Sequence, residues 1–206
     1  MVILAEFSDV HFQTGNPKEA FYRLMNEPGY SENGGTGSAK DFYMESSFGQ
    51  YEPMIDVYGP VVLPHEMKYY GAPSAGANDI RPAEMIRDAC QLLDSEIDFS
   101  EYDLDQDGAI DNVYLFYAGY GQADGGNVNT IWPHAWYVWQ GARIMATFDG
   151  VQLDRYDCSN EIQSGSNEMV GIGTFCHEFG HVLGLPDLYS ASYSSTEHPG
   201  NWTLMA

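Results

Sequence analysis

The stretch from Phe175 to Tyr189, FCHEFGHVLGLPDLY, restricts the local fold more than any other part of the chain. His177 and His181 stand four residues apart, so in a helix they would lie on one face with their Cβ atoms about 5–6 Å apart. Gly184 can adopt the left-handed conformation that ends many helices, and Pro186 cannot continue a helix. The stretch therefore predicts a helix that ends at Gly184 and a chain that then reverses.

These residues also form a candidate metal site. Two imidazoles on one helix face can reach one ion at about 2.0–2.1 Å, and after the reversal Asp187 can return as a third ligand. Glu178 lies off the histidine face, where a carboxylate can accept a proton from water held at the metal. Three protein ligands leave one position for water, and the set His177, His181 and Asp187 favours catalytic zinc over calcium or magnesium.

The alternative interpretation is a helix with two hydrogen-bonded polar histidines. With this composition, chance would give the histidine pair with its glutamate in about one chain in a hundred, and the further glycine and aspartate in roughly one in ten thousand. We therefore prefer the metal site. Glu197 is the only downstream glutamate that could replace Asp187 as third ligand, but only Asp187 follows the glycine turn that would deliver it.

A second acidic pattern, DLDQDGAID, covers residues 103–111. It has aspartates at positions 1, 3, 5 and 9 and Gly108 at position 6, the spacing of a calcium loop of the EF-hand kind, in which the carbonyl of position 7 also binds. Position 12 is Tyr114 instead of glutamate, and a strand is expected to follow, so the pattern predicts a structural calcium loop and not an EF-hand. The expected ligands are Asp103, Asp105, Asp107, the carbonyl of Ala109, and Asp111. The alternative is a solvated acidic turn, but four crowded carboxylates repel one another unless a cation neutralises them.

The charge of the chain argues against one class of partner. Eight lysines and arginines stand against thirty aspartates and glutamates, for a formal charge of −22. Such a surface repels phosphate backbones, so we expect no nucleic-acid partner. Solubility and divalent cations both account for the excess of carboxylates. No window reaches the roughly 18 unbroken apolar residues of a membrane-spanning helix, and residues 1–12 lack the features of a signal peptide.

The remaining pattern predicts alternating strands and helices. Strands are expected over residues 2–7, within 52–64 and over 112–121, with a hairpin about Asp149-Gly150 that joins 143–148 to 151–158. Helices are expected over residues 16–29, 38–50, 81–97 and 168–184. This order predicts one α/β domain, residues 1–206, with a mixed sheet.

The three cysteines, Cys90, Cys158 and Cys176, leave the redox state open. A Cys158–Cys176 bridge would tie a strand to the metal helix, and the absence of any bridge is equally compatible with the sequence. His134 stands between tryptophans in WPHAW, so we expect an ordinary packed histidine and not a ligand.

The sequence HEFGHVLGLPD resembles the extended zinc-binding motif of the metzincins, H-E-x-x-H-x-x-G-x-x-D in its aspartate form. The span from DLDQDGAIDNVYLFYAGYG through IWPHAW to GTFCHEFGHVLGLPDLY is similar to the immune inhibitor A family of secreted bacterial metallopeptidases, peptidase family M6. The similarity is close over roughly the C-terminal half. It implies zinc ligation by His177, His181 and Asp187, with Glu178 as the base.

The resemblance also implies a metzincin-like α+β fold, in which a mixed twisted sheet packs against helices that include the zinc-binding helix. A methionine turn lies under the metal in such folds, and NWTLMA supplies Met205 for it. Family members continue past this turn into a lower subdomain. Because residue 206 follows Met205 directly, we expect the lower subdomain to be truncated here.

These observations together predict a zinc endopeptidase that acts on protein or peptide substrates outside the cell or at its surface, with calcium as a structural ion. We expect a monomer, and a substrate that lies along an edge strand formed by residues 151–158. The alternative is a calcium-stabilised binding or adhesion module with an inert metal site.

Overall fold

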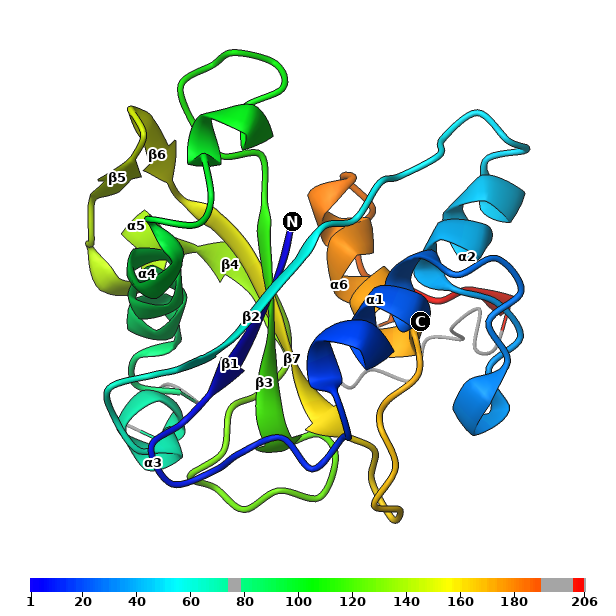
Figure 1. Cartoon of the computed structure of the whole chain (residues 1–206), viewed down its shortest axis with the longest axis horizontal. Coiled ribbons are helices and arrows are strands. Elements are labelled where there is room, and N and C mark those ends of the chain that lie inside the picture. Colours follow the sequence, from blue (N-terminus) through cyan, green and yellow to red (C-terminus); the bar gives the residue numbers. More distant parts are fainter. Residues whose placement is uncertain (74–78, 190–201, 206) are drawn as a thin grey trace.

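A computed structural model of the chain describes residues 1–73, 79–189 and 202–205. Its main feature is a five-stranded sheet with the strand order β2-β1-β3-β7-β4 (Figure 1). Four strands are parallel and β4, at one edge, is antiparallel. The strands are β1 (Val2–Glu6), β2 (Val57–Val62), β3 (Val113–Tyr120), β4 (His134–Tyr137) and β7 (Arg155–Ile162). The mixed α/β architecture expected from the sequence is therefore confirmed.

Helices cover both faces of this sheet (Figure 1). One face carries α1 (Pro17–Asn26), α2 (Ala39–Ser46) and α6 (Gly173–Val182). The other carries α3 (Met67–Gly71), α4 (Pro82–Leu93) and α5 (Val138–Ala142). Short 3-10 turns lie at η1 (Glu32–Gly34) and η2 (Phe99–Tyr102). Among the residues that the structure describes, no helix combines the length and the apolar character needed to cross a bilayer.

The central strand β3 joins the two layers because its side chains alternate between them. Tyr114 and Phe116 face the α6 layer, whereas Leu115 and Tyr117 face the α4 layer, and all four are buried. A parallel strand covered on both faces is expected to be apolar throughout, as this one is. The ring centroids of Tyr114 and Phe175 are 4.5 Å apart, so β3 directly supports α6, the helix that carries the histidine motif.

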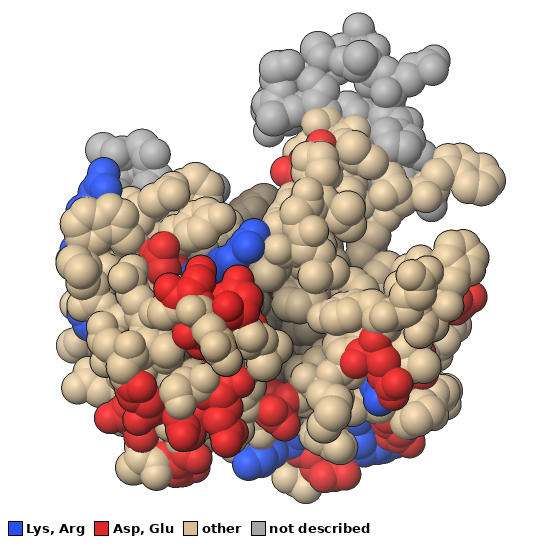
Figure 2. Space-filling model, turned by 90° about the horizontal axis from the view of Figure 1, so that it is seen from above, with Lys and Arg blue, Asp and Glu red and all other residues tan. Residues whose placement is uncertain are grey.

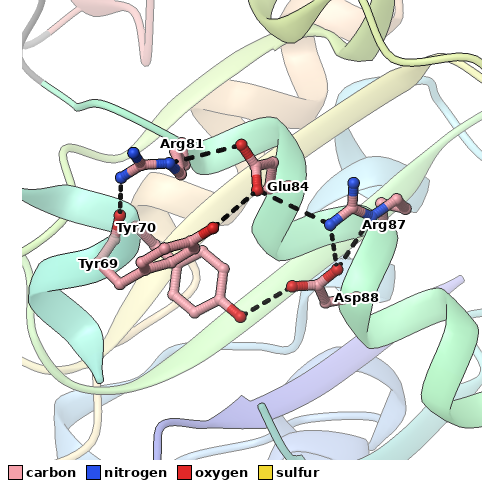
Figure 3. Close-up of polar contacts among 6 residues, drawn as sticks. All are labelled: Tyr69, Tyr70, Arg81, Glu84, Arg87 and Asp88. Carbon is pink, nitrogen blue, oxygen red and sulfur yellow. Dashed lines mark hydrogen bonds and ion pairs between the residues drawn. The ribbon is translucent and has the colours of Figure 1, made fainter. Parts of the chain in front are cut away.

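A polar network holds α3 against α4 (Figure 3). The buried carboxylate of Asp88 accepts hydrogen bonds from the Tyr70 hydroxyl at 2.9 Å and from Arg87 Nη2 at 2.6 Å. Glu84 accepts one from the Tyr69 hydroxyl at 3.2 Å. Each acidic group in the network is thus matched with donors, and the network stabilises the packing of two helices on the side of the sheet away from α6.

Most expected elements are present, and the hairpin is formed as the Asp-Gly pair predicted. β5 (Ala146–Phe148) and β6 (Val151–Leu153) pair across Asp149 and Gly150, which have φ of 47° and 89°. Positive φ at both turn residues is the conformation that favours this dipeptide.

Two expectations about the second half of the chain were wrong in detail. The expected strand over residues 151–158 is divided at Asp154 between β6 and β7. The motif helix begins at Gly173 and not at residue 168, because Met169 pairs with Ile162 and the Val170 amide donates to the Glu161 carbonyl at 2.8 Å. The residues before Gly173 therefore extend the sheet.

The Cys158–Cys176 bridge is absent. All three cysteines are buried free thiols. Cys158 packs in the cluster on the α4 face of the sheet, whereas Cys176 packs in the cluster on the α6 face. The sheet itself separates the two sulfur atoms, which excludes a bridge between them.

The buried carboxylate of Glu161 joins three segments of the fold. One oxygen accepts hydrogen bonds from the backbone N–H groups of Gln13 and Thr14 at 2.7 and 2.6 Å, and the other accepts one from Gly119 at 2.9 Å. The side chain is fully buried, so these bonds have no competition from water. Glu161 therefore fixes the loop after β1 to the ends of β3 and β7.

We predict that Glu161→Gln lowers the free energy of unfolding by about 2 kcal/mol. In the wild type, backbone N–H groups donate to both carboxylate oxygens. In the variant, the glutamine NH₂ group would replace one of these oxygens, so two donors would face each other and a buried hydrogen bond would be lost. Denaturant unfolding of the variant measures this loss. Glu168→Gln, at an exposed position in the same segment of chain, is the matched control. Equal midpoints for the two variants would contradict the prediction.

Candidate metal centre

The end of α6 brings the motif histidines and the aspartate together. Gly184, at φ 92°, ends the helix: its N–H donates to the His181 carbonyl at 3.0 Å, and the N–H of Leu185 donates to the Gly180 carbonyl at 3.0 Å. This pair of bonds is the Schellman motif, which glycine at this position favours. The chain then reverses and places Asp187 Oδ1 3.4 Å from Nε2 of both His177 and His181.

Backbone carbonyls orient both imidazole rings. Nδ1 of His177 lies 2.8 Å from the Leu204 carbonyl, and Nδ1 of His181 lies 2.9 Å from the Leu185 carbonyl. A carbonyl only accepts, so each Nδ1 carries a hydrogen, and in the neutral ring each Nε2 then keeps its lone pair. Both lone pairs are therefore available on the side where Asp187 lies.

The distances from Asp187 to the two imidazole nitrogens fit one small cation. Ligand atoms about 2.0–2.1 Å from an ion at tetrahedral angles are about 3.3 Å apart, close to the 3.4 Å seen from each imidazole to Asp187. With both rings neutral, the two Nε2 lone pairs and the carboxylate oxygen would repel one another, and a cation between the three atoms would remove this repulsion. The donor set, two imidazoles and one carboxylate, is one that zinc accepts.

Glu178 lies beside this group and is largely buried, with 8% of its surface exposed. A carboxylate oxygen of Glu178 and one ring nitrogen each of His177 and His181 all lie within 4.8 Å of one another. Burial raises the pKa of Glu178 to about 7, and Asp187 adds to this rise, while His181 and a hydrogen bond from the backbone of Ala135 oppose it. Ala135 belongs to β4, so the sheet edge and the glutamate are in direct contact.

Met205 packs under the same helix. A Cβ atom at Gly180 would come within 2.9 Å of the Met205 sulfur, so α6 approaches this methionine at a residue without a side chain. The Met205 carbonyl accepts from the Leu188 amide at 2.7 Å, and the residue is buried. The structure thus places the predicted methionine below the helix and next to the loop that carries Asp187.

Tyr189 is a site residue that the motif alone did not identify. Its side chain is hydrogen-bonded to Asp187, and burial, followed by the charge of Asp187, raises its pKa. Its position two residues after Asp187, on the same reversal, is the only sequence signal for this contact. Glu197, the rival third ligand, lies outside the described residues.

The edge strand next to the site is β4 and not residues 151–158. β7 lies inside the sheet between β3 and β4, so the backbone groups of its residues are already paired on both sides. β4 pairs with Arg155–Cys158 on one side and has no partner strand on the other in the described part of the chain. β4 is therefore the edge strand of the sheet that lies beside Glu178.

His134 of β4 is a packed histidine, as its surroundings in the sequence indicated. Its Nδ1 lies 2.7 Å from the Trp132 carbonyl and its Nε2 lies 2.9 Å from the Tyr156 hydroxyl. Burial lowers the pKa of His134. Both ring nitrogens are therefore engaged in bonds that hold β4 on the sheet.

The aspartate turn brings three of its four carboxylates together. Oxygens of Asp103, Asp105 and Asp111 lie within 4.8 Å of one another, and burial, together with the nearby aspartates, raises the pKa of Asp111. Asp107 lies outside this group, and its carboxylate accepts from the Ala109 amide at 2.9 Å. Acidic side chains far outnumber basic ones on the face of the molecule seen from above, where they form several clusters (Figure 2).

The aspartate turn is also bonded to the hairpin. The Gly108 carbonyl accepts from the Gln152 amide at 2.8 Å, and the Ile110 amide donates to the Gln152 carbonyl at 2.9 Å. The turn is therefore fixed at the start of β3 and against β6.

Comparison with known proteins agrees with this geometry. The family model described as Immune inhibitor A peptidase M6, catalytic domain, matches residues 2–206. The chain is 29% identical over 220 residues to immune inhibitor A of Bacillus thuringiensis subsp. alesti, an alignment that covers 92% of this chain and 31% of the relative. It is 26% identical over 230 residues to the pre-pro-metalloprotease PrtV of Vibrio cholerae serotype O1, covering 98% and 24%. The chain thus spans less than a third of the length of either relative.

Proposed function

Because this chain belongs to the immune inhibitor A family of M6 metallopeptidases, we propose that it is a zinc-dependent endopeptidase that hydrolyses peptide bonds in protein substrates. The observation that carries the proposal is the convergence of two Nε2 lone pairs on the carboxylate of Asp187, with Glu178 beside them. If the histidines served only to pack the helix, there would be no reason for the Nε2 atoms of both rings to face the same carboxylate.

The roles of the residues follow from this arrangement. His177, His181 and Asp187 would hold the metal, and zinc bound there supplies the polarisation of the scissile carbonyl and lowers the pKa of its water toward about 7. Glu178 accepts a proton from the attacking water and gives it to the leaving amine. The Ala135 backbone lies beside the Glu178 carboxylate and opposes the rise in its pKa. Met205 supports α6 from below.

We assign substrate binding to the free edge of β4. An extended peptide gains main-chain hydrogen bonds when it adds to an exposed sheet edge. The contact between Ala135 and Glu178 would place such a peptide beside the catalytic base. This assignment replaces the edge expected over residues 151–158.

The experiment that tests the function measures metal and cleavage on the same sample. Purified chain is loaded with zinc, its bound zinc is quantified, and casein cleavage is followed with and without 1,10-phenanthroline. We expect about one zinc per chain at the catalytic site and cleavage that the chelator abolishes. Bound zinc without cleavage would favour a binding or adhesion module with an inert metal site, and absence of zinc after loading would overturn the proposal.

We further propose that residues 1–206 act as one catalytic domain outside the cell, with calcium in the aspartate turn. The three clustered carboxylates support a cation there, and calcium at the required millimolar level is available outside cells. Asp103, Asp105, Asp111 and the Ala109 carbonyl are the proposed ligands, and Asp107 would join them by releasing the Ala109 amide. The ion would then stabilise the junction of the turn with β3 and β6.

Calcium is therefore expected to raise the thermal stability of the chain. At a concentration about 100 times its dissociation constant, it should add about 2.7 kcal/mol to the free energy of unfolding. The measurement is the melting temperature of metal-stripped protein during calcium titration at fixed zinc, for the wild type and for Asp103→Asn/Asp105→Asn. The double variant should show a much smaller rise; an unchanged wild-type melting curve would exclude a calcium site in this turn.

A further inference from the structure

Arg155 is a half-buried cation beside the candidate metal centre. It is the first residue of β7 and pairs with Tyr137 of β4 in the sheet. Its Nη2 donates a hydrogen bond to the His181 carbonyl at 3.0 Å, and its guanidinium carbon lies 5.8 Å from the centroid of the Tyr137 ring. One side chain therefore contacts both the edge strand and the helix that carries the histidines.

The carbonyl that Arg155 contacts lies where the metal centre is assembled. The same His181 oxygen accepts the Gly184 amide at 3.0 Å, the bond that ends α6 and begins the return of Asp187. Carbonyls in the last turn of a helix lie at the negative end of its dipole, so a cation there is favourable. Arg155 thus stabilises the junction between the two-histidine helix and the loop with the third ligand.

The contact also links this junction to the sheet. Arg155 reaches His181 across 26 residues of sequence, and on its other side it lies over Tyr137, two residues from the Ala135 backbone that bonds to Glu178. A guanidinium group has five N–H donors in a planar array, so it can donate to a carbonyl while it remains over an aromatic ring. A lysine ammonium cannot reproduce this combination.

We infer that Arg155 is a positioning residue for the metal centre: by holding the His181 carbonyl against β7 and Tyr137, it sets where His181 and Asp187 converge relative to the edge strand. This inference rests on the proposed zinc site. It assigns no substrate contact and no proton transfer to Arg155. Arg155 instead raises the affinity of the chain for the metal by fixing the positions of His181 and Asp187.

The chain provides a matched control in Arg143. Its guanidinium carbon lies 5.4 Å from the Trp139 ring in the neighbouring α5 segment, so it resembles Arg155 in charge and in stacking on an aromatic ring. It makes no hydrogen bond to α6 among the described residues. Loss of Arg143 therefore removes an equal charge and a similar stacking contact without changing the end of α6.

The test compares Arg155→Met, Arg155→Lys and Arg143→Met with the wild type. Zinc affinity is measured by competition with a chromophoric chelator, and the melting temperature of each zinc-free protein is recorded separately. Loss of a hydrogen-bond partner of a metal-binding side chain typically weakens binding about 10–100-fold, and because Arg155 bonds to the main chain of His181, the lower end of this range, about 10-fold, is expected for Arg155→Met. Arg155→Lys should recover part of this loss, and Arg143→Met should bind zinc like the wild type.

The separate readouts distinguish a positioning role from a contribution to folding alone. If Arg155 served only stability, the melting temperature of the zinc-free variant would fall while the folded protein kept its zinc affinity, and the inference would be overturned. Should Arg155→Met fail to fold, wild-type zinc affinity in Arg155→Lys would overturn it equally. A wild-type chain that binds no zinc would instead reject the proposed function itself.

Discussion

Replacement of Glu178 by glutamine is expected to lower kcat by about 10³-fold and to leave zinc bound. General acid–base catalysis by one side chain typically contributes about 10²–10⁴-fold, and glutamine keeps the size and hydrogen-bonding shape of the residue while it cannot take a proton. The zinc ligands His177, His181 and Asp187 are unchanged in the variant. The measurement is steady-state cleavage of a quenched fluorescent peptide together with zinc content.

Two features make this substitution informative. The Glu178 carboxylate is largely enclosed, so another water-exposed base cannot easily replace it. The backbone N–H of Ala135, which bonds to the carboxylate, can bond equally well to the amide oxygen of glutamine, so the local structure should persist. Glu168→Gln, at an exposed position five residues before α6, is the control and should retain wild-type turnover. Full activity in Glu178→Gln with zinc bound would reject Glu178 as the base.

The metal centre was largely predictable because its signals act over a few residues. The spacing of His177 and His181 is a property of one helix, and the glycine turn that returns Asp187 depends only on the conformation of Gly184 and on Pro186. β3 was predictable for a similar reason, since a run of buried branched and aromatic residues does not suit an exposed position.

The features that were missed depend on pairing between distant segments. β4 is only four residues long and follows Pro133, and it becomes a strand because β7 pairs with it along Arg155–Cys158. Because of the same pairing, the edge strand beside the site is β4, and not residues 151–158 as expected from the sequence. Local sequence patterns do not predict which strands lie next to each other in a sheet.

The cysteines and Arg155 show the same limit. Cys158 lies in β7 and Cys176 in α6, two elements that pack together, but the face of the sheet on which the Cys158 side chain lies depends on strand register. Arg155 has no motif of its own, and its contact with His181 follows from the position of β7 below the end of α6. Sequence spacing thus identified the groups to which we assign metal binding and proton transfer, whereas the residues that orient them required the packed structure.

Substitution of Asp187 by alanine is expected to weaken zinc binding by more than about 100-fold, beyond the range caused by loss of an outer partner. Among the described residues, the variant removes the one carboxylate that lies 3.4 Å from both imidazole Nε2 atoms, and it leaves two neutral ligands for a doubly charged ion. Tyr189 also loses its hydrogen-bond partner, so the reversal after Gly184 should become less rigid. Zinc affinity by chelator competition gives the magnitude.

Glu197→Ala is the control, because it removes the other downstream carboxylate that the sequence offered as a third ligand. It should bind zinc with wild-type affinity. The comparison tests the geometry of the Schellman turn directly, because only that turn brings a carboxylate back to the two imidazoles within six residues of His181. If Glu197→Ala lost zinc and Asp187→Ala retained it, the ligand would come from beyond the turn, and the placement of Asp187 at the metal would be wrong.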